Sequence, residues 1–332
     1  MSEIKNVLVT GGAGYIGSVL VPKLLANGYK VRIYDNFSYT DMGIKSILHD
    51  PALSIINADI RNEEKIKEAV KGVDCIIHLA AISNDPSAEL DQELTRKINY
   101  GAYPLILDAA KAAGVKRFIN PSSIGVYGIN FDNNVTEKEP VNPLTEYARC
   151  KVKSENLVKE YSSENFTTVS MRCGTVCGWS PRMRFDLSVN TLTAVAINNN
   201  ELTVWGGNQM RPQIHIEDIT DFFLSLVTIP SEKINGKIFN AAGHNTAVIH
   251  IAETIQKVLD NGLKLISAPP RDDERSYHVN SDLIKKELGL APKKTIENAI
   301  QDIVKAYKEK KWTDYHDPLY NNVKKIKQNQ LI

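Results

Sequence analysis

The chain has 332 residues, of which 42% are hydrophobic and 24% charged, a composition typical of a soluble globular protein with a sizeable core. Its 40 basic and 39 acidic residues give a net charge of +1, so neither nucleic acid nor an anionic membrane is indicated as a partner. No apolar run is long enough to span a membrane and the N-terminus has no signal-peptide pattern, so a cytoplasmic location is expected.

Four cysteines are present, namely Cys75, Cys150, Cys173 and Cys177. Their spacing matches neither a disulfide framework nor a C-x-x-C metal site. We therefore expect reduced, mostly buried thiols and no bound metal.

The first strong motif is VLVTGGAGYIG, from Val7 to Gly17. Its apolar start predicts a buried parallel strand, and Gly12, Gly14 and Gly17 then form G-x-G-x-x-G at the start of a helix. In this pattern the glycines permit a tight turn, a close approach of backbone to pyrophosphate, and close packing of helix on strand. The helix N-terminus favours the anion, so the motif predicts a dinucleotide site.

A second strand is predicted from Lys30 to Tyr34, and Asp35 follows it, 18 residues after Gly17, which fits the spacing of an acidic ribose ligand. A carboxylate at this position accepts hydrogen bonds from the adenosine ribose and repels a 2′-phosphate, which favours NAD over NADP. A third strand, from Ser54 to Ile56, leads to Asp59 and Ile60, which are expected to contact the same cofactor.

The pattern of strand and helix continues with a helix from Glu63 to Val70 and a buried strand from Cys75 to Leu79. Ala80 and Ala81 follow this strand, and their small side chains admit a cofactor closely. His78 lies inside the apolar strand, where a lone histidine is usually a core residue with satisfied hydrogen bonds, so it is left out of the mechanism.

A helical pattern from Asp91 to Ala113 ends at Gly114, with a possible kink at Pro104, and a strand follows from Arg117 to Asn120. The repeated alternation predicts an α/β fold built on a doubly wound parallel sheet with right-handed crossovers.

A further helix is predicted between Pro143 and Ser162, which places Tyr147 and Lys151 one turn apart on the same face. A phenol ordinarily has a pKa of about 10, so Tyr147 needs a stabilised phenolate to act as a base near pH 7. The ammonium of Lys151 and a positively charged nicotinamide can both supply that stabilisation.

Together these segments resemble the extended short-chain dehydrogenase/reductases of the NAD-dependent nucleotide-sugar epimerase/dehydratase family, to which UDP-glucose 4-epimerases belong. The resemblance covers nearly the whole chain. It rests on TGGAGYIG (10–17), YDN (34–36), ADIRN (58–62), HLAA (78–81), SSIGVYG (122–128), YARCK (147–151) and RPQIHIEDI (211–219).

The resemblance implies a Rossmann domain at 1–172, with a return to it at about 212–243, and a smaller, mainly nucleotide-sugar-binding lobe at 173–332. The implied catalytic residues are Ser123, Tyr147 and Lys151, with Ser123 rather than Ser122 holding the sugar oxygen. The implied cofactor-binding residues are Gly11, Gly14, Tyr15, Ile16, Gly17, Asp35, Asn36, Asp59, Ile60, Leu79, Ala80, Ala81, Asn99, Tyr147 and Lys151.

In the second half, a sixth strand is expected from Val169 to Cys173, and His215 and Asp218 are expected to hold a later strand return together. The implied ligands of the nucleotide-sugar substrate are Ser123, Thr175, Arg182, Arg184, Arg211 and Arg271. Thr175 stands where sugar epimerases commonly carry asparagine, which puts that phosphate contact in doubt.

The predicted function is epimerisation at sugar C4 through a transient 4-ketosugar. Ile124 and Gly125 occupy the positions where 4,6-dehydratases carry Asp-Glu, and since neither can carry a proton, dehydration is disfavoured. The run SPRMRFDL (180–187) resembles a branch that includes nucleotide-sugar 4-dehydrogenases. A 4-dehydrogenase or 4-ketoreductase is therefore the alternative, and a non-catalytic NAD-binding protein is the alternative from another class.

Helices are expected in the smaller lobe at 249–259, 282–288 and 296–307. The polar stretch 312–332 is expected to wrap the surface or fray, without a chemical role. The resemblance further implies a homodimer that pairs two helices of each subunit, those within 91–113 and 145–162.

Overall fold

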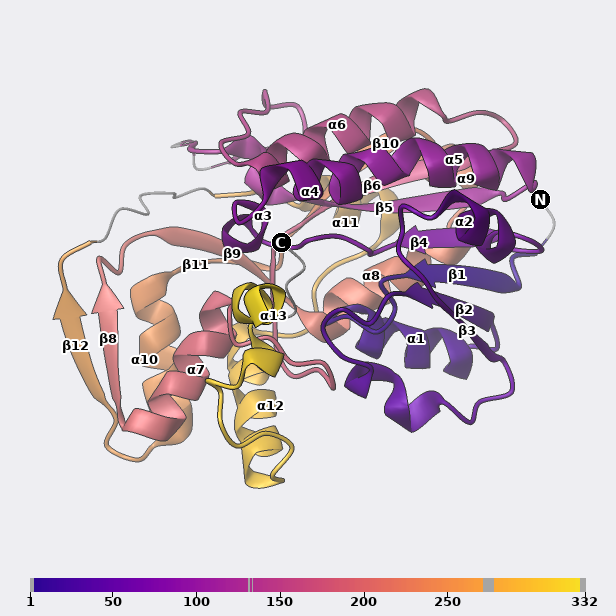
Figure 1. The fold of residues 1–332 in the computed structure, drawn as a ribbon. Coiled ribbons are helices and arrows are strands. Elements are labelled where there is room, and N and C mark those ends of the chain that lie inside the picture. The colour runs from indigo at the N-terminus through magenta and orange to yellow at the C-terminus, as the bar shows by residue number, and fades with distance from the viewer. Residues whose placement is uncertain (1–2, 131, 133, 271–277, 329–332) are drawn as a thin grey trace.

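The short apolar runs of the first half form a seven-stranded parallel sheet, the central layer of the molecule (Figure 1). The computed structural model describes residues 3–130, 132, 134–270 and 278–328. The strands are, in spatial order, β10 (Lys237–Ala241), β6 (Thr167–Cys173), β5 (Arg117–Ser123), β4 (Cys75–His78), β1 (Asn6–Thr10), β2 (Lys30–Asp35) and β3 (Leu53–Asn57). Every neighbouring pair is parallel, which confirms the predicted doubly wound sheet.

Helices cover both faces of this sheet, so its strands are buried on both sides. On β1, Val7 and Val9 belong to one hydrophobic core, whereas Leu8 between them belongs to the core on the opposite face. This two-sided burial explains why the strands read as continuous apolar runs. The helices are α1 (Gly17–Ala26) and α8 (Ile216–Thr228) on one face, and α2 (Glu63–Ala69), α5 (Ala102–Ala112) and α6 (Glu146–Glu160) on the other.

Strand β5 continues past its predicted end at Asn120 to Ser123. Its neighbour β4 pairs with it only as far as Ile119, whereas β6 pairs with it along its whole length. Pro121 has no N–H to donate to a neighbouring strand, and its carbonyl oxygen accepts a hydrogen bond from Lys151 (2.7 Å). The carboxyl end of β5 is therefore open on the β4 side, at the edge where parallel sheets bind ligands.

The smaller lobe contains two short sheets and three longer helices, seen on the left of Figure 1. In the three-stranded sheet β9 lies between β7 and β11, and β8 pairs with β12. The strands are β7 (Thr175–Cys177), β8 (Glu201–Trp205), β9 (Met210–His215), β11 (His244–Ala247) and β12 (Lys264–Ala268), and the helices are α7 (Ser188–Asn199), α10 (Val248–Leu259) and α12 (Ile296–Lys308). Shorter helices are α3 (Asp85–Ala88), α4 (Gln92–Arg96), α9 (Ser231–Ile234), α11 (Asp282–Leu288) and α13 (Asn322–Gln328), and 3-10 turns are at Met42–Ile47, Ile124–Tyr127 and Pro318–Tyr320.

The chain passes between the central layer and the smaller lobe through very short connections. Strand β6 ends at Cys173 and β7 begins at Thr175, while β9 ends at His215 and α8 begins at Ile216. The stretch 212–243, expected to return to the first layer, contributes α8 and β10 to it. The chain therefore crosses between the central layer and the smaller lobe more than once.

The helical pattern from Asp91 to Ala113 forms three consecutive pieces rather than one helix kinked at Pro104. Between α4 and α5 lies a π-helical turn, Lys97–Gly101. Proline has no N–H to donate to the preceding turn, and widened turns of this kind accommodate such a missing hydrogen bond. The irregularity therefore lies on the N-terminal side of Pro104.

The prediction for the C-terminal stretch is wrong in one respect, because Trp312 at its start is built into the core, and Asn322 and Ile326 are also buried. Trp312 is 2% exposed, and its ring packs on Phe185 (centroids 4.6 Å apart) and Tyr307 (4.8 Å). Phe185 also donates its N–H to the carbonyl of Tyr320 (2.8 Å). The composition of the stretch is polar overall and so does not indicate this packing, which depends on one buried tryptophan.

We predict that Trp312→Ala lowers the free energy of unfolding by about 3–5 kcal/mol, because it empties a buried aromatic site. The matched control is Trp205→Ala, since Trp205 is 40% exposed and its loss should cost less than about 1 kcal/mol. Urea unfolding followed by circular dichroism measures both. Equal losses for the two variants would contradict the anchoring role of Trp312.

Candidate active site

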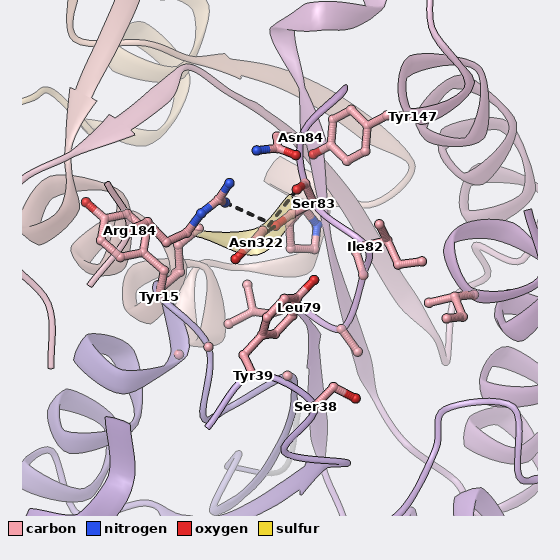
Figure 2. A pocket seen from close by; sticks show the side chains of 18 of the residues that line it. Tyr15, Ser38, Tyr39, Leu79, Ile82, Ser83, Asn84, Tyr147, Arg184 and Asn322 are labelled. Atoms are coloured by element: carbon pink, nitrogen blue, oxygen red, sulfur yellow. Dashed lines mark hydrogen bonds between the residues drawn. The ribbon is translucent and has the colours of Figure 1, made fainter. Parts of the chain in front are cut away.

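A cavity of about 380 Å³ lies at the carboxyl end of the parallel sheet, and residues of both halves of the chain line it (Figure 2). The order of the strands reverses between β1 and β4, which is where doubly wound folds place their ligands. The predicted site residues that line the cavity are Gly11, Gly14, Tyr15, Ile16, Gly17, Asp35, Asn36, Asp59, Ile60, Leu79, Ala80, Ala81, Ser123, Tyr147, Lys151, Thr175, Arg182 and Arg184.

The glycine-rich turn has room for backbone only. A Cβ on Gly11, whose φ is +69°, would lie 2.7 Å from the backbone nitrogen of Ala80, and one on Gly17 would lie 2.5 Å from the carbonyl oxygen of Gly12. Helix α1 then begins without a side-chain cap and without an acidic residue in its first turn. The N–H groups of Ser18 and Val19 donate to the carbonyls of Gly14 and Ile16 (2.9 and 3.1 Å), so this helix start offers an anion chiefly its positive field, which fits the pyrophosphate of a dinucleotide.

Asp35 joins the glycine-rich turn to the end of β2. Its carboxylate accepts hydrogen bonds from the N–H groups of Ala13 (3.0 Å) and Phe37 (2.8 Å), and burial raises its pKa. Asp59, at the end of the third strand, is held by Arg61 (2.7 Å), whose hydrogen bonds lower the pKa of the Asp59 carboxyl. Both carboxylates line the cavity where a ribose is expected.

Two buried residues shape the loop after β4 without lining the cavity. The Nδ1 of His78 lies 2.9 Å from the hydroxyl of Thr10, which also accepts the N–H of Ala80 (3.2 Å). Burial lowers the pKa of His78 to about 3, consistent with a neutral core residue, but its buried Nε2 has no hydrogen-bond partner among the described residues, so the expectation of satisfied hydrogen bonds holds only for Nδ1. Asn99 hydrogen-bonds both the N–H and the carbonyl of Ile82 (2.8 Å each). Asn99, expected to contact the cofactor, thus acts on the cavity through Ile82.

The predicted catalytic residues come from β5 and α6. Thr145 caps α6 by accepting the N–H of Ala148 (3.2 Å), so the helix begins just before Tyr147. Ser123 ends β5, and its hydroxyl accepts the N–H of Gly125 (3.1 Å). The ammonium of Lys151 lies 5.6 Å from the ring centroid of Tyr147. All three side chains line the cavity.

Burial acts in opposite senses on the tyrosine and the lysine. It raises the pKa of Tyr147, with the nearby Asp85 carboxylate adding to the rise. It lowers the pKa of Lys151 to about 8. Without a bound ligand Tyr147 is therefore a neutral phenol, and a positive charge beside it is needed to make it a base.

A buried ion pair lies behind these residues. Arg172 on β6 donates two hydrogen bonds to Glu155 on α6 (2.9 and 2.8 Å), and Ser122 donates a third (2.5 Å). Arg172 also donates to the hydroxyl of Tyr127 (2.8 Å), which donates in turn to Asn240 on β10 (2.7 Å). Sequence analysis missed this network, although Glu155 lies one helical turn after Lys151.

The arginines from the second half have different surroundings. Arg184 donates to both carboxylate oxygens of Asp186 (2.9 and 3.0 Å) and to the hydroxyl of Ser83 (3.1 Å). Its charge is already balanced, which makes it less suited to a phosphate than expected. The guanidinium of Arg182 lies over the ring of Tyr39, 4.6 Å from its centroid, near the cofactor-binding turn rather than the smaller lobe.

The remaining predicted substrate residues are not all at the cavity. Thr175 lines it, at the start of β7. Arg211, on β9, is not among the described residues that line it, and Arg271 lies outside the described residues. His215 accepts the N–H of Glu217, and Asp218 accepts those of Lys293 and Lys294, contacts that link the start of α8 to a later segment.

Sequence analysis also missed a polar cluster that closes one side of the cavity, shown in Figure 2. Asn84 has φ 80° and ψ 155°, a backbone conformation that costs energy for any residue but glycine, and it donates to Asp186 (3.0 Å). Asn322, from α13, donates to the hydroxyl of Ser83 (3.1 Å). Asn322 is distant in sequence from every motif, so no local sequence pattern predicts its place at the cavity.

Other kinds of site find no support in the described residues. No group of three or more His, Cys, Asp or Glu side chains is arranged to hold a metal ion. No helix in this part of the chain has the length and apolar character that crossing a bilayer requires.

Comparison with known proteins agrees with this geometry. The model of the NAD dependent epimerase/dehydratase family matches residues 7–242. UDP-glucose 4-epimerase 4 of Oryza sativa subsp. japonica is 25% identical over 80% of this chain and 80% of its own length. dTDP-D-glucose 4,6-dehydratase of Mus musculus is 27% identical over 93% of this chain and 90% of its own.

The crystal structure of UDP-glucose 4-epimerase from Thermotoga maritima with UDP-glucose superposes with a TM-score of 0.82. It covers 92% of this chain and 99% of its own, at 24% identity. At this identity the similarity shows the fold alone.

We predict that Gly11→Ala abolishes detectable NAD binding, because its Cβ would collide with the backbone nitrogen of Ala80. The control is Gly72→Ala, since Gly72 also has a positive φ (+70°) but nothing lies within 4 Å of its Cβ position. Both variants should lose about 1 kcal/mol of stability from the backbone alone. Isothermal titration with NAD separates them, and unchanged binding by Gly11→Ala would contradict the assignment.

The depressed pKa of Lys151 predicts how stability depends on pH in protein stripped of its cofactor. The unfolded state holds this proton up to pH 10.5 and the folded state only to about 8, so this residue makes stability rise between those values. Lys151→Met should remove about 3 kcal/mol of that rise. Lys153→Met, an exposed neighbour on α6, should keep it. Denaturant unfolding at several pH values measures the difference, and parallel curves for wild type and Lys151→Met would refute it.

Proposed function

We propose, because this chain belongs to the NAD dependent epimerase/dehydratase family, that it inverts the configuration at C4 of a nucleotide-diphosphate sugar. Members of this family are NAD-dependent enzymes that act on nucleotide sugars, and this chain is such an enzyme. The observation that carries the proposal is the meeting of Ser123, Tyr147 and Lys151 at one cavity that the glycine-rich turn also lines.

When bound, NAD supplies the acceptor and later donor of the C4 hydride. Tyr147 removes the proton from the sugar 4-hydroxyl. It returns the proton after the 4-ketosugar has rotated within the site so that its other face accepts the hydride. Ser123 holds the sugar oxygen by a hydrogen bond, and the positive charge of Lys151 lowers the cost of the Tyr147 phenolate. This positive charge is needed because burial by itself raises the pKa of Tyr147 and so disfavours the phenolate.

Dehydration is less well supported, although dehydratases are among the relatives. Elimination of water from the sugar requires a further proton donor and acceptor beside the catalytic hydroxyl. Ile124 and Gly125 follow Ser123 directly and line the cavity, and neither can carry a proton. This favours the reactions that need only the three catalytic residues.

A 4-dehydrogenase or 4-ketoreductase uses the same three residues and differs only in whether the ketone leaves. The resemblance of residues 180–187 to a branch with such enzymes supports this alternative. The intact catalytic residues speak against a non-catalytic NAD-binding protein. The cytoplasmic location and the homodimer through helices of the regions 91–113 and 145–162 stay predictions.

The proposal is tested with purified protein and a panel of UDP- and dTDP-sugars. We expect interconversion of one pair of 4-epimers, detected by chromatography, without accumulation of NADH. Stoichiometric NADH or net ketosugar would instead establish the dehydrogenase, and a 4-keto-6-deoxysugar would establish the dehydratase.

Tyr147→Phe should lower kcat for this conversion by about 100- to 10,000-fold, since it removes the group that transfers the proton. The NAD content of the variant should equal that of wild type, which distinguishes lost chemistry from a lost cofactor. Undiminished turnover by Tyr147→Phe would overturn the catalytic assignment.

A further inference from the structure

Arg182 is a buried cation that lacks a complete set of partners. The side chain is 3% exposed, and its Nε has no hydrogen-bond partner among the described residues. Its Nη2 donates to the side-chain oxygen of Asn322 (2.5 Å), which is a neutral acceptor. The carboxylates of Asp35 and Asp186 act electrostatically on Arg182 and favour its charged form, whereas its side-chain hydrogen bond goes to the neutral Asn322. An anionic ligand that accepts hydrogen bonds from this buried guanidinium is therefore the partner that suits the position.

The position of Arg182 indicates which anion that is. Its backbone N–H reaches the hydroxyl of Ser18 on α1 (3.4 Å), and its guanidinium covers the ring of Tyr39 in the loop after β2. It therefore lies over the glycine-rich turn, where the uncapped start of α1 also attracts an anion. Two positive fields that lie beside the same turn suit a diphosphate.

Asn322 connects Arg182 to the rest of the cavity wall. Besides accepting from Arg182, its side chain donates to the hydroxyl of Ser83 (3.1 Å), and its backbone N–H donates to Asp186 (3.1 Å). The residue is 2% exposed and lines the cavity. Asn322 thus joins α13 to two segments that are far from it in sequence, one at Ser83 and one at 182–186, as Figure 2 shows for Ser83 and Asn322.

The apolar side of α13 adds to this closure. Ile326, one turn after Asn322, is buried with Ile82 and Ala88, and Tyr39 and Tyr147 pack against the same cluster. Tyr39 belongs to the loop after β2 and Tyr147 to the catalytic end of the cavity. Helix α13 therefore belongs to the same apolar cluster as side chains from the cofactor loop and from the catalytic residues.

We propose that Arg182 binds the diphosphate of NAD, and that α13, joined to Arg182 through Asn322, covers the bound cofactor and retains it between turnovers. The inference depends on the use of NAD, which family membership establishes, and not on which sugar reacts. Release of NAD then requires α13 to leave its place.

The role of Arg182 is tested by titrating cofactor-free protein with NAD, ADP and adenosine. Arg182→Met should weaken binding of NAD and ADP by about 10- to 100-fold and leave adenosine unaffected, because adenosine has no phosphate. Arg182→Lys, which keeps the charge, should give an intermediate loss. Unchanged affinity for NAD and ADP, or an equal loss for adenosine, would overturn the assignment.

The role of α13 is tested by the rate at which the full-length holoenzyme releases radiolabelled NAD into excess unlabelled NAD. Asn322→Ala should release it about 10-fold faster, and Ile326→Ala should also accelerate release. Lys327→Ala is the control, because Lys327 is exposed on the same helix and its variant should match wild type. If Asn322→Ala does not fold, Ile326→Ala decides. A wild-type rate in the folded Asn322→Ala and Ile326→Ala variants would refute the cover.

Discussion

The buried ion pair between Arg172 and Glu155 fixes the reactive end of the molecule. Glu155 lies on α6, which carries Tyr147 and Lys151, while Arg172 lies on β6, the strand that pairs with β5 as far as Ser123. One carboxylate therefore sets the distance between the helix and the strand whose residues must act together. Losing either partner would leave an unpaired charge in the core, at a cost of about 3–5 kcal/mol. The geometry of the catalytic residues thus depends on a contact that lies behind them.

Sequence patterns predicted those parts of the fold and site that local interactions determine. The strand from Lys30 to Asp35 and the turn between Gly11 and Gly17 were recognisable because two-sided burial and tight backbone spacing leave few acceptable residue types. Tyr147 and Lys151 lie one helical turn apart, so their proximity follows from the helix alone. The parallel sheet followed from the alternation of these elements, since parallel strands require crossover connections.

The rest could not be predicted because it depends on contacts between distant segments. The placement of Arg182 beside Tyr39, and of Asn322 beside Ser83, follows from how the smaller lobe folds back, and no spacing in the sequence encodes it. Trp312 is the one tryptophan of a polar stretch, so composition suggested an exposed tail while packing makes this residue part of the core. In each case tertiary packing overrode the local pattern.

The short connections between the central layer and the smaller lobe restrict how the enzyme can move. Enzymes that enclose their ligands by hinge closure of domains need a few loop residues that absorb large changes in φ and ψ. Here β7 begins one residue after β6 ends, and α8 follows β9 directly, so these junctions hold few residues that could absorb such changes. A wide rotation of one layer against the other is therefore disfavoured. Ligands therefore bind and leave through the rearrangement of small surface segments. The rates of binding and release depend on how strongly the contacts of those segments hold them in place.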